Sequence, residues 1–157
     1  AWTSVQAIFS FQGALILADS KNSMAYYGRG LLYEELGMFE NAERDYSKGI
    51  ELEPNVTGLY RRGMLYQVLM KKPCLGVLDF KRAFELDKTD LVIFTQYASA
   101  LSECGNKRLA LRYYKEIADY AVTDNVGQYY NEVALNEIKK IEAFLKANPE
   151  YNSKLFE

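Results

Sequence analysis

Small and aromatic side chains recur along this chain at a fixed interval. The small positions are Ala42, Gly76 and Ala110, each 34 residues after the one before, and the aromatic positions, four residues further on, are Tyr46, Phe80 and Tyr114. An amphipathic helix has a period of about 3.6 residues and does not by itself produce so long an interval. The pattern therefore indicates a repeated structural unit.

Within each interval the apolar positions follow helical spacing, and turn-forming residues divide them. Gly37 and Gly105 fall where a helix end needs a left-handed residue, and Pro73 is tolerated in a first helical turn. The predicted helices run over residues 23–36, 39–53, 57–70, 74–87, 91–104 and 107–121. The first helix of the second unit starts 33 residues after its predecessor, so we expect one extra residue in the loop around Lys71 and Lys72.

The start of the chain carries a partial version of the same pattern. Residues 11–17 resemble residues 46–52, which belong to the second helix of the first unit. We therefore expect a helix over about residues 3–18, within a partial repeat at 3–20 that stacks beneath the first full unit.

Near the other end, apolar residues recur at helical spacing from Tyr130 to Leu145, with charged residues largely on the opposite side. This spacing predicts a long helix over about residues 126–147. Such a helix either caps the last unit against water or opens a further repeat.

The residues at the repeating positions resemble the signature of the tetratricopeptide repeat (TPR) family. The three units read Tyr26-x-x-Arg29-Gly30-x-x-Tyr33 with Ala42-x-x-x-Tyr46 and Pro54, then Leu59-x-x-Arg62-Gly63-x-x-Tyr66 with Gly76-x-x-x-Phe80, then Phe94-x-x-Tyr97-Ala98-x-x-Leu101 with Ala110-x-x-x-Tyr114. The resemblance implies an all-α fold, a right-handed superhelical solenoid of antiparallel helix pairs. It also implies a single TPR-like domain over residues 1–157, with units at about 23–56, 57–90 and 91–124.

Composition argues against most catalytic and nucleic-acid functions. The chain has no histidine, which removes the commonest general base and zinc ligand, and its net charge of −2 gives no reason to expect nucleic acid as a partner. We expect no enzyme activity, no cofactor and no metal. Cys74 and Cys104 are too far apart for a CxxC motif, and we expect small, buried or half-buried apolar side chains there. No apolar run approaches the length of a membrane span, and we expect a cytoplasmic protein without membrane insertion.

The resemblance also suggests which residues bind. In a TPR-like stack the first helix of each unit lines a concave wall, and the residues there that carry no packing signature face the groove. The predicted peptide-binding residues are Tyr27, Leu31, Glu34, Tyr60, Arg61, Met64, Gln67, Thr95, Gln96 and Ser99. Tyrosine, methionine and arginine are enriched at protein interfaces, so this mixture favours a peptide or helical segment of another protein.

The sequence is compatible with two functions. The first is an adaptor or scaffold segment within a complex, and the second is a small chaperone or targeting factor for one client protein, similar to bacterial type III secretion chaperones. TPR modules that hold Hsp70 or Hsp90 tails share a lysine, asparagine and arginine set, whereas this chain has Tyr27, Leu31 and Gln96 at comparable places, with Arg61 as the cation. We predict no binding of a peptide that ends in EEVD.

Arg29 and Arg62 recur one unit apart, where the family usually has an aliphatic residue. They could present two cations to acidic groups of a partner. Alternatively, each aliphatic stem packs between helices while the guanidinium reaches a neighbouring carboxylate such as Glu34 or Glu51.

Overall fold

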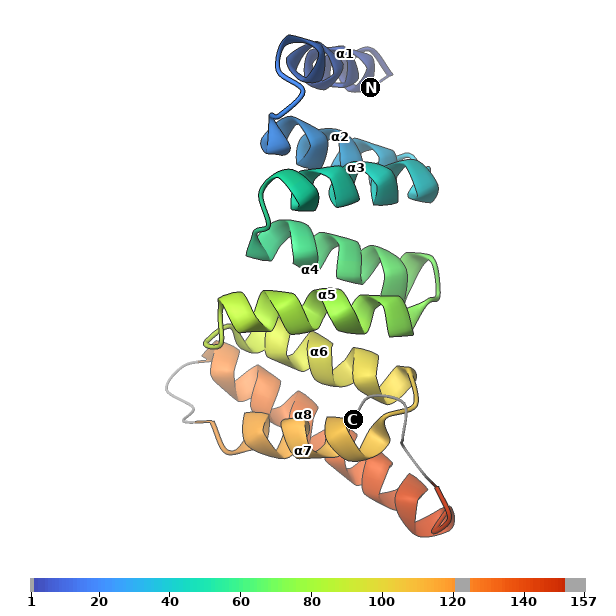
Figure 1. Cartoon of the computed structure of the whole chain (residues 1–157). Coiled ribbons are helices and arrows are strands. Elements are labelled where there is room, and N and C mark those ends of the chain that lie inside the picture. Colours follow the sequence, from blue (N-terminus) through green and yellow to red (C-terminus); the bar gives the residue numbers. More distant parts are fainter. Residues whose placement is uncertain (1, 121–124, 152–157) are drawn as a thin grey trace.

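The structure, a computed structural model, describes residues 2–120 and 125–151, and every regular element in these ranges is a helix (Figure 1). The helices stack in chain order, from α1 at one end of the molecule to α7 and α8 at the other. Their bounds are α1 Trp2–Ala18, α2 Ser23–Glu35, α3 Phe39–Leu52, α4 Val56–Met64, η1 Leu65–Leu69, α5 Pro73–Leu86, α6 Leu91–Glu103, α7 Lys107–Ala118 and α8 Asn125–Ala147. The prediction of an all-α solenoid of antiparallel pairs is confirmed. The predicted helix end at residue 121 and the end of the third unit, 122–124, lie outside the described residues.

Asparagine and aspartate side chains start the first helix of each unit. The Asn22 Oδ1 accepts a hydrogen bond from the Ala25 N–H at 3.0 Å, and the Asn55 Oδ1 accepts one from the Gly58 N–H at 2.8 Å. In the third unit Asp90 caps α6 in the same way. These caps satisfy backbone donors that a helix leaves unpaired at its start, and so fix where each unit begins.

The turn between the two helices of each unit contains one left-handed residue. Gly37 has φ 72° and Gly105 has φ 100°, and the residue after each donates its N–H to a carbonyl five residues back. In the second unit this place is taken by Lys71, with φ 55°. The three turns therefore share one conformation, although only two of them contain glycine.

The extra residue of the second unit lies in a helix and not in a loop, so that prediction is wrong. Residues 65–69 form a π-helical turn, η1, that continues α4. The N–H of Lys72 accordingly bonds to the carbonyl of Tyr66, one residue further back than in the other two turns. A π-turn absorbs one inserted residue without breaking the backbone hydrogen bonds, which keeps the turn geometry of the unit unchanged.

Each full unit is closed by a buried aromatic ring packed against a small residue. Tyr46, Phe80 and Tyr114 are only 1%, 0% and 2% exposed. A methyl group added to Gly30 would come within 2.8 Å of the Tyr46 ring, and one added to Gly63 within 2.8 Å of the Phe80 ring. The absence of a side chain on the first helix is therefore what lets the ring of the second helix fit beneath it.

In each of the first two units an ion pair between a half-buried arginine and a buried aspartate joins the two helices of that unit. Arg29 donates to both carboxylate oxygens of Asp45 at 2.6 and 2.7 Å. Arg62 does the same to Asp79 at 2.8 and 2.6 Å. Two parallel hydrogen bonds fix the guanidinium in the plane of the carboxylate.

The two arginines thus reach carboxylates within their own units and do not face an open wall as a pair of free cations. The suggested partners Glu34 and Glu51 are wrong, because Asp45 and Asp79 lie on the face of the second helix that turns toward the first. In the third unit the corresponding residues are Tyr97 and Tyr113, whose ring centroids lie 5.2 Å apart. A ring contact takes the place of the ion pair there.

The two cysteines form a disulfide, which corrects the expectation of free apolar side chains. Cys74, in the first turn of α5, is bonded to Cys104, the residue after the last turn of α6, and their Cα atoms are 4.9 Å apart. Because α5 and α6 are antiparallel neighbours, the start of α5 lies beside the end of α6, and residues 30 apart in sequence meet there. The bond joins the second unit covalently to the third.

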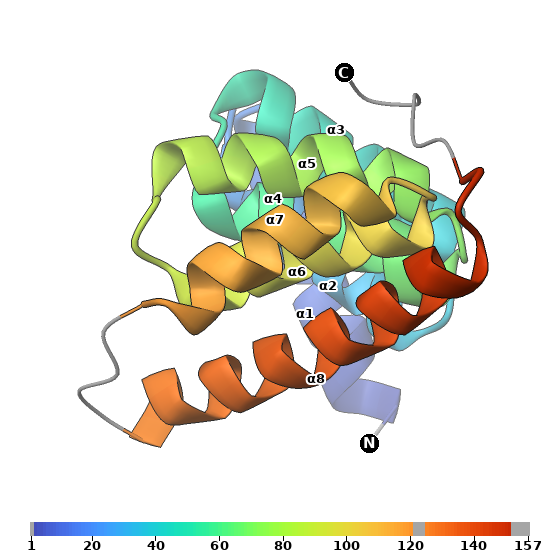
Figure 2. The same ribbon diagram turned by 90° about the horizontal axis from the view of Figure 1, so that it is seen from below.

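The last helix packs obliquely across the third unit and extends beyond the end of α7 (Figures 1 and 2). Ala134 and Ile141 are the residues of α8 buried against the core. After α8 the chain turns back, and the Tyr151 hydroxyl donates a hydrogen bond to the carbonyl of Gly105 in the α6–α7 turn. The described part of the chain after α7 therefore covers one side of the third unit.

We predict that Asp79→Ala lowers the free energy of unfolding by about 3–5 kcal/mol, because it leaves the half-buried Arg62 guanidinium without its carboxylate and with the Ser47 hydroxyl as its remaining hydrogen-bond partner. Replacing both residues, in Arg62→Leu with Asp79→Leu, is expected to cost less than the single change. Urea unfolding followed by circular dichroism measures both. A double variant less stable than Asp79→Ala would contradict this account of the pair.

We also predict that reducing the Cys74–Cys104 bond lowers the free energy of unfolding by about 3 kcal/mol while the helical fold persists, because the reduced chain regains the freedom of the loop that the bond closes. Thermal unfolding with and without a thiol reductant checks this. The variant with Cys74→Ser and Cys104→Ser should not respond to reductant. A wild-type melting temperature indifferent to reductant would show the prediction wrong.

Candidate peptide-binding wall

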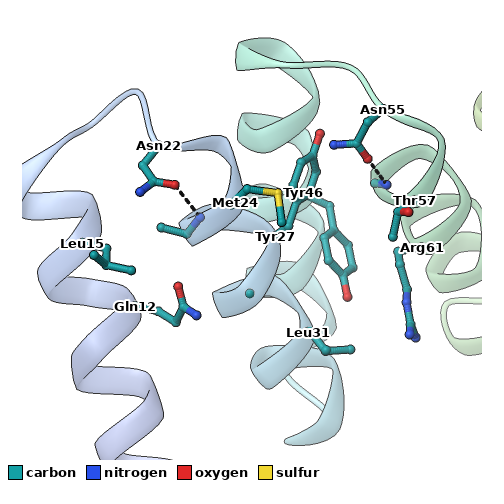
Figure 3. Close-up of a pocket in the computed structure, with 13 residues that line it drawn as sticks. Gln12, Leu15, Asn22, Met24, Tyr27, Leu31, Tyr46, Asn55, Thr57 and Arg61 are labelled. Atoms are coloured by element: carbon teal, nitrogen blue, oxygen red, sulfur yellow. Dashed lines mark hydrogen bonds between the residues drawn. The ribbon is translucent and has the colours of Figure 1, made fainter.

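The first helices of the units present a wall that contains two adjacent hollows. The first hollow has a volume of about 530 Å³ and lies between α1, α2 and α4 (Figure 3). The residues that surround it are Gln12, Leu15, Asn22, Met24, Ala25, Tyr27, Gly28, Leu31, Tyr46, Asn55, Thr57, Gly58 and Arg61. Most of this surface is carbon, so the hollow suits an apolar side chain.

The second hollow, of about 270 Å³, lies one step along the stack between α4 and α6. It is lined by Val56, Thr57, Tyr60, Arg61, Asp90, Val92 and Ile93. Thr57 and Arg61 border both hollows, and they form the ridge that separates them. The two hollows are thus neighbouring parts of one surface.

Arg61 is the cation of this surface. Its side chain is exposed and points along the wall from α4 (Figure 3). Among residues 2–120 and 125–151 it makes no ion pair and no hydrogen bond, in contrast to Arg29 and Arg62. An exposed guanidinium between two apolar hollows can donate hydrogen bonds to a carboxylate of a bound molecule without losing an existing ion pair.

Acidic groups flank the wall on both sides of Arg61. Glu34 accepts a hydrogen bond of 2.7 Å from the Tyr46 hydroxyl, and Asp90 borders the second hollow. Burial, with the Glu34 hydrogen bond next, raises the pKa of Tyr46 far above its usual range. Burial raises the pKa of Tyr60 as well. Both phenols therefore stay neutral at physiological pH, and the charge contrast on the wall is between Arg61 and the carboxylates.

Four of the predicted binding residues come together at the hollows. Tyr27 and Leu31 border the first hollow, Tyr60 borders the second, and Arg61 borders both. Met64 lies one helical turn beyond Tyr60 and packs half-buried against the core. Whether these residues bind a peptide stays a prediction.

Two predicted binding residues do not face an open wall, so their placement was wrong. Gln67 is only 5% exposed and Thr95 only 6%. The π-turn carries Gln67 toward α6, where its side-chain N–H group donates to the Ser99 hydroxyl at 3.1 Å and to Glu103 at 2.7 Å. Thr95 lies on the buried side of α6.

The remaining predicted residues lie around this junction between the second and third units. Ser99 donates a hydrogen bond to Glu103 at 3.1 Å in addition to its contact with Gln67. Gln96 is half-buried on α6, and neither hollow includes it. This part of the wall is a hydrogen-bonded seam between α6 and the π-helical turn η1.

Sequence reasoning missed the contribution of α1 and of the helix starts. Gln12 and Leu15 close the first hollow from α1, and Met24 and Thr57 occupy the first turns of α2 and α4. The partial repeat at the start of the sequence could have indicated this contribution. A helix equivalent to the second helix of a unit, placed beneath the first full unit, must face the first helix of that unit. The Gln12 Oε1 is buried and accepts no hydrogen bond from the described residues.

Tyr27 is both a wall residue and a packing residue. Its ring lies against two glycines. A methyl group added to Gly49 would come within 2.6 Å of the ring, and one added to Gly58 would come within 2.3 Å. Its hydroxyl donates a hydrogen bond of 2.6 Å to the Glu53 carbonyl. Burial, together with the nearby Glu53 charge, raises the pKa of Tyr27 to about 12. The ring therefore holds the junction between the first two units in place.

In the part of the chain that the structure describes, no group of three or more cysteine, aspartate or glutamate side chains is placed to hold a metal ion. None of the helices in those same ranges is both long enough and apolar enough to cross a membrane.

Comparison with known proteins agrees with this architecture. Residues 23–56, the first full unit, match the family model described as tetratricopeptide repeat. The resemblance to the TPR family is thereby confirmed: residues 23–56 form a tetratricopeptide repeat, and the described helices have the fold of a TPR solenoid.

Several solved structures share this fold at low sequence identity. YrrB, described as a TPR protein with an unusual peptide-binding site, superposes with a TM-score of 0.70 at 20% identity, over 95% of this chain and 80% of that one. The second TPR domain of human RPAP3, solved with an HSP70 peptide, gives 0.62 at 21% identity, over 76% and 94%. MamA from Desulfovibrio magneticus RS-1 gives 0.67 at 14% identity, over 92% and 88%.

A curated relative is a lipoprotein NlpI homolog from Haemophilus influenzae (strain ATCC 51907 / DSM 11121 / KW20 / Rd), 31% identical over 72 residues. The match covers 45% of this chain and 23% of the relative, so the chain spans under a quarter of that protein's length.

We predict that Tyr27→Phe lowers the free energy of unfolding at pH 8 by about 1 kcal/mol, through loss of the hydrogen bond to Glu53. Because the folded-state pKa of Tyr27 is raised from 10.0 to about 12, its neutral phenol contributes stability that is fully present below pH 10 and is lost as the pH rises toward 12. Tyr27→Phe should therefore show a shallower loss of stability than wild type over this pH window.

Urea unfolding at pH 8, 10 and 11 measures the effect, and Tyr129→Phe, which alters an exposed ring, is the control. Parallel pH profiles for wild type and Tyr27→Phe would remove the assigned role of the hydroxyl.

Proposed function

We propose that this chain is a non-catalytic protein-interaction module that holds a peptide segment of a partner protein on the wall formed by α2, α4 and α6. In this role it acts as an adaptor or scaffold segment. The observation that carries the proposal is the exposed Arg61 between two apolar hollows.

The arrangement of the two hollows favours a peptide over a small molecule as the bound ligand. Each hollow is open and is lined by residues from at least two helices, so a chain can cross from one to the other over the ridge at Thr57 and Arg61. Apolar side chains would enter the hollows, while a carboxylate between them pairs with Arg61.

The comparisons support the same class of function. Structures with this fold include the RPAP3 domains bound to HSP70 and HSP90 peptides, and YrrB, which is described as having an unusual peptide-binding site. These relatives are at most 21% identical in sequence and share the fold, so their ligands suggest a peptide without naming it. The Hsp-type carboxylate clamp needs several cations, whereas this wall has Arg61 beside Glu34 and Asp90.

The disulfide bears on the cellular compartment in which the protein acts. The sequence suggested the cytoplasm, but disulfides persist mainly in oxidising compartments, and the Cys74–Cys104 bond favours such a compartment. The lipoprotein relative is consistent with that alternative. We propose an oxidising compartment, and alkylation of the protein taken directly from its source, followed by mass spectrometry, tests it.

Peptide selection tests the proposed function. We predict that a displayed library of random peptides yields binders with an acidic residue flanked on both sides by apolar residues. Arg61→Ala should weaken a selected peptide by about tenfold, because it removes one charge-assisted hydrogen-bonding partner. Arg44→Ala changes an exposed arginine on α3, away from the wall, and should leave affinity unchanged.

The peptides SGPTIEEVD and SRMEEVD serve as negative probes in calorimetry, and we expect no measurable binding to them. Selected peptides without an acidic residue, or equal affinity for wild type and Arg61→Ala, would overturn the assigned wall.

A further inference from the structure

The second hollow, between α4 and α6, carries a carboxylate beside a tyrosine ring. Asp90 borders this hollow from the start of α6, and Tyr60 borders it from α4. Tyr130, on α8, packs half-buried against the same core cluster as Tyr60. The α6 side of the hollow is therefore negative, whereas Arg61 makes the ridge toward the first hollow positive.

One oxygen of the Asp90 carboxylate is used within the chain, and the other has no partner there. The Oδ1 accepts hydrogen bonds from the Val92 N–H at 2.8 Å and from the Ile93 N–H at 3.2 Å. Within residues 2–120 and 125–151 the Oδ2 accepts no hydrogen bond, and Asp90 forms no ion pair, although Arg61 borders the same hollow. A half-buried negative charge is thus available to a ligand.

Two tyrosines lie close enough to Asp90 to sense its charge. Burial raises the pKa of Tyr60, and the Asp90 charge adds to this rise while the Arg61 charge opposes it. Burial also raises the pKa of Tyr130, and the nearby Tyr60, Tyr129 and Asp90 groups raise it further. Both phenols are neutral at physiological pH, so the negative charge at this end of the hollow is that of Asp90.

Apolar side chains continue across the hollow as far as Asp90. Val56 contributes from the start of α4, and Val92 and Ile93 follow Asp90 in α6. Such a surface can hold the methylene stem of a long basic side chain while its head group stays at the polar rim. A tyrosine ring attracts a cation over its face, and a carboxylate pairs with it. The hollow therefore combines the groups that bind a basic side chain.

We propose that the second hollow binds a basic side chain of the partner peptide, with its cation between the Asp90 carboxylate and the Tyr60 ring. This inference rests on the proposed peptide-binding function and gives the peptide a second charged determinant. The acidic residue of the peptide pairs with Arg61. Beyond the apolar residue on the side of the second hollow, a basic residue pairs with Asp90.

The free oxygen of Asp90 suits a lysine at least as well as an arginine. The two parallel hydrogen bonds of a guanidinium need both oxygens of a carboxylate, and the Asp90 Oδ1 already accepts two backbone N–H groups. An ammonium group acts as a compact point charge and needs only one oxygen.

The two charges of the peptide support each other. Arg61 borders the second hollow and repels a cation there. An acidic residue of the peptide that pairs with Arg61 offsets this repulsion. A peptide that carries both charges therefore binds more tightly than a peptide that carries either charge alone.

Asp90 also caps α6, and this role does not require a charge. Asn22 and Asn55 cap α2 and α4, and asparagine and aspartate cap helices about equally well. Asp90→Asn therefore removes the charge and keeps the cap, so the variant should fold, and circular dichroism checks this. Asp119→Asn makes the same change at an exposed aspartate after α7 that borders neither hollow, and is the matched control.

The test uses the full chain and the tightest-binding peptide from the displayed library, together with a version in which norleucine replaces its basic residue. We expect the selected peptides to carry a lysine or arginine at a fixed distance from the acidic residue. In calorimetry Asp90→Asn should weaken the parent peptide by about tenfold and leave the norleucine peptide unchanged. Asp119→Asn should change neither affinity.

Some results would overturn this inference and leave the proposed function intact. They are selected peptides that depend on Arg61 but carry no basic residue, and an Asp90→Asn variant that binds the parent peptide as tightly as wild type or weakens both peptides equally. Tighter binding by Asp90→Asn would also overturn it, because Asp90 would then only compete with the peptide for Arg61. A library without binders, or binders indifferent to Arg61→Ala, would overturn the proposed function and this inference together.

Discussion

The packing of one aromatic ring against one residue without a bulky side chain determines how the two helices of each unit approach. At Gly63 the Phe80 ring packs directly against the helix backbone. Because protein interiors are packed as densely as molecular crystals, the spacing of the two helices can change little once this contact has formed. Repeating it in successive units then fixes the rise of the whole stack.

The other features of the molecule add contacts between the same two helices, or accommodate an inserted residue, and leave this ring contact unchanged. The pairs Arg29–Asp45 and Arg62–Asp79 cross between the same two helices, and a tyrosine pair replaces them in the third unit. The π-turn absorbs an inserted residue, so the turn that follows keeps its conformation. The wall follows as a consequence, since the hollows lie where successive first helices meet at the angle that the stack imposes.

Much of this could be predicted from the sequence, because the small and aromatic residues that set the spacing are visible at a regular interval. The helix bounds, the partial first repeat and the long last helix all follow from that interval and from local caps. The partners of Arg29 and Arg62 could have been found as well. Asp45 and Asp79 are themselves 34 residues apart, in the same register as the small residues.

The features that escaped prediction depend on backbone detail that the repeat does not encode. An extra residue between Tyr66 and Pro73 fits either a loop or a π-turn. Because the chain forms a π-turn, Gln67 turns toward α6 and away from the wall. The meeting of Cys74 and Cys104 depends on which helix ends lie together in the stack. The hollows depend on how far successive units rotate, and the spacing of residues in the sequence does not determine that rotation, so it does not reveal that Gln12 and Thr57 border a hollow.

The most direct measurement is a double-mutant cycle across the central contact, with Gly63→Val and Phe80→Leu, followed by urea unfolding. Gly63→Val alone should destabilise the fold by about 1–3 kcal/mol or more, because its side chain meets the ring, whereas Gly13→Ala, where nothing lies within 4 Å, should cost nothing. We predict that Phe80→Leu recovers part of the loss caused by Gly63→Val, giving a coupling free energy above about 0.5 kcal/mol. Strict additivity of the two changes would show that the ring and the glycine do not set the spacing of the helices.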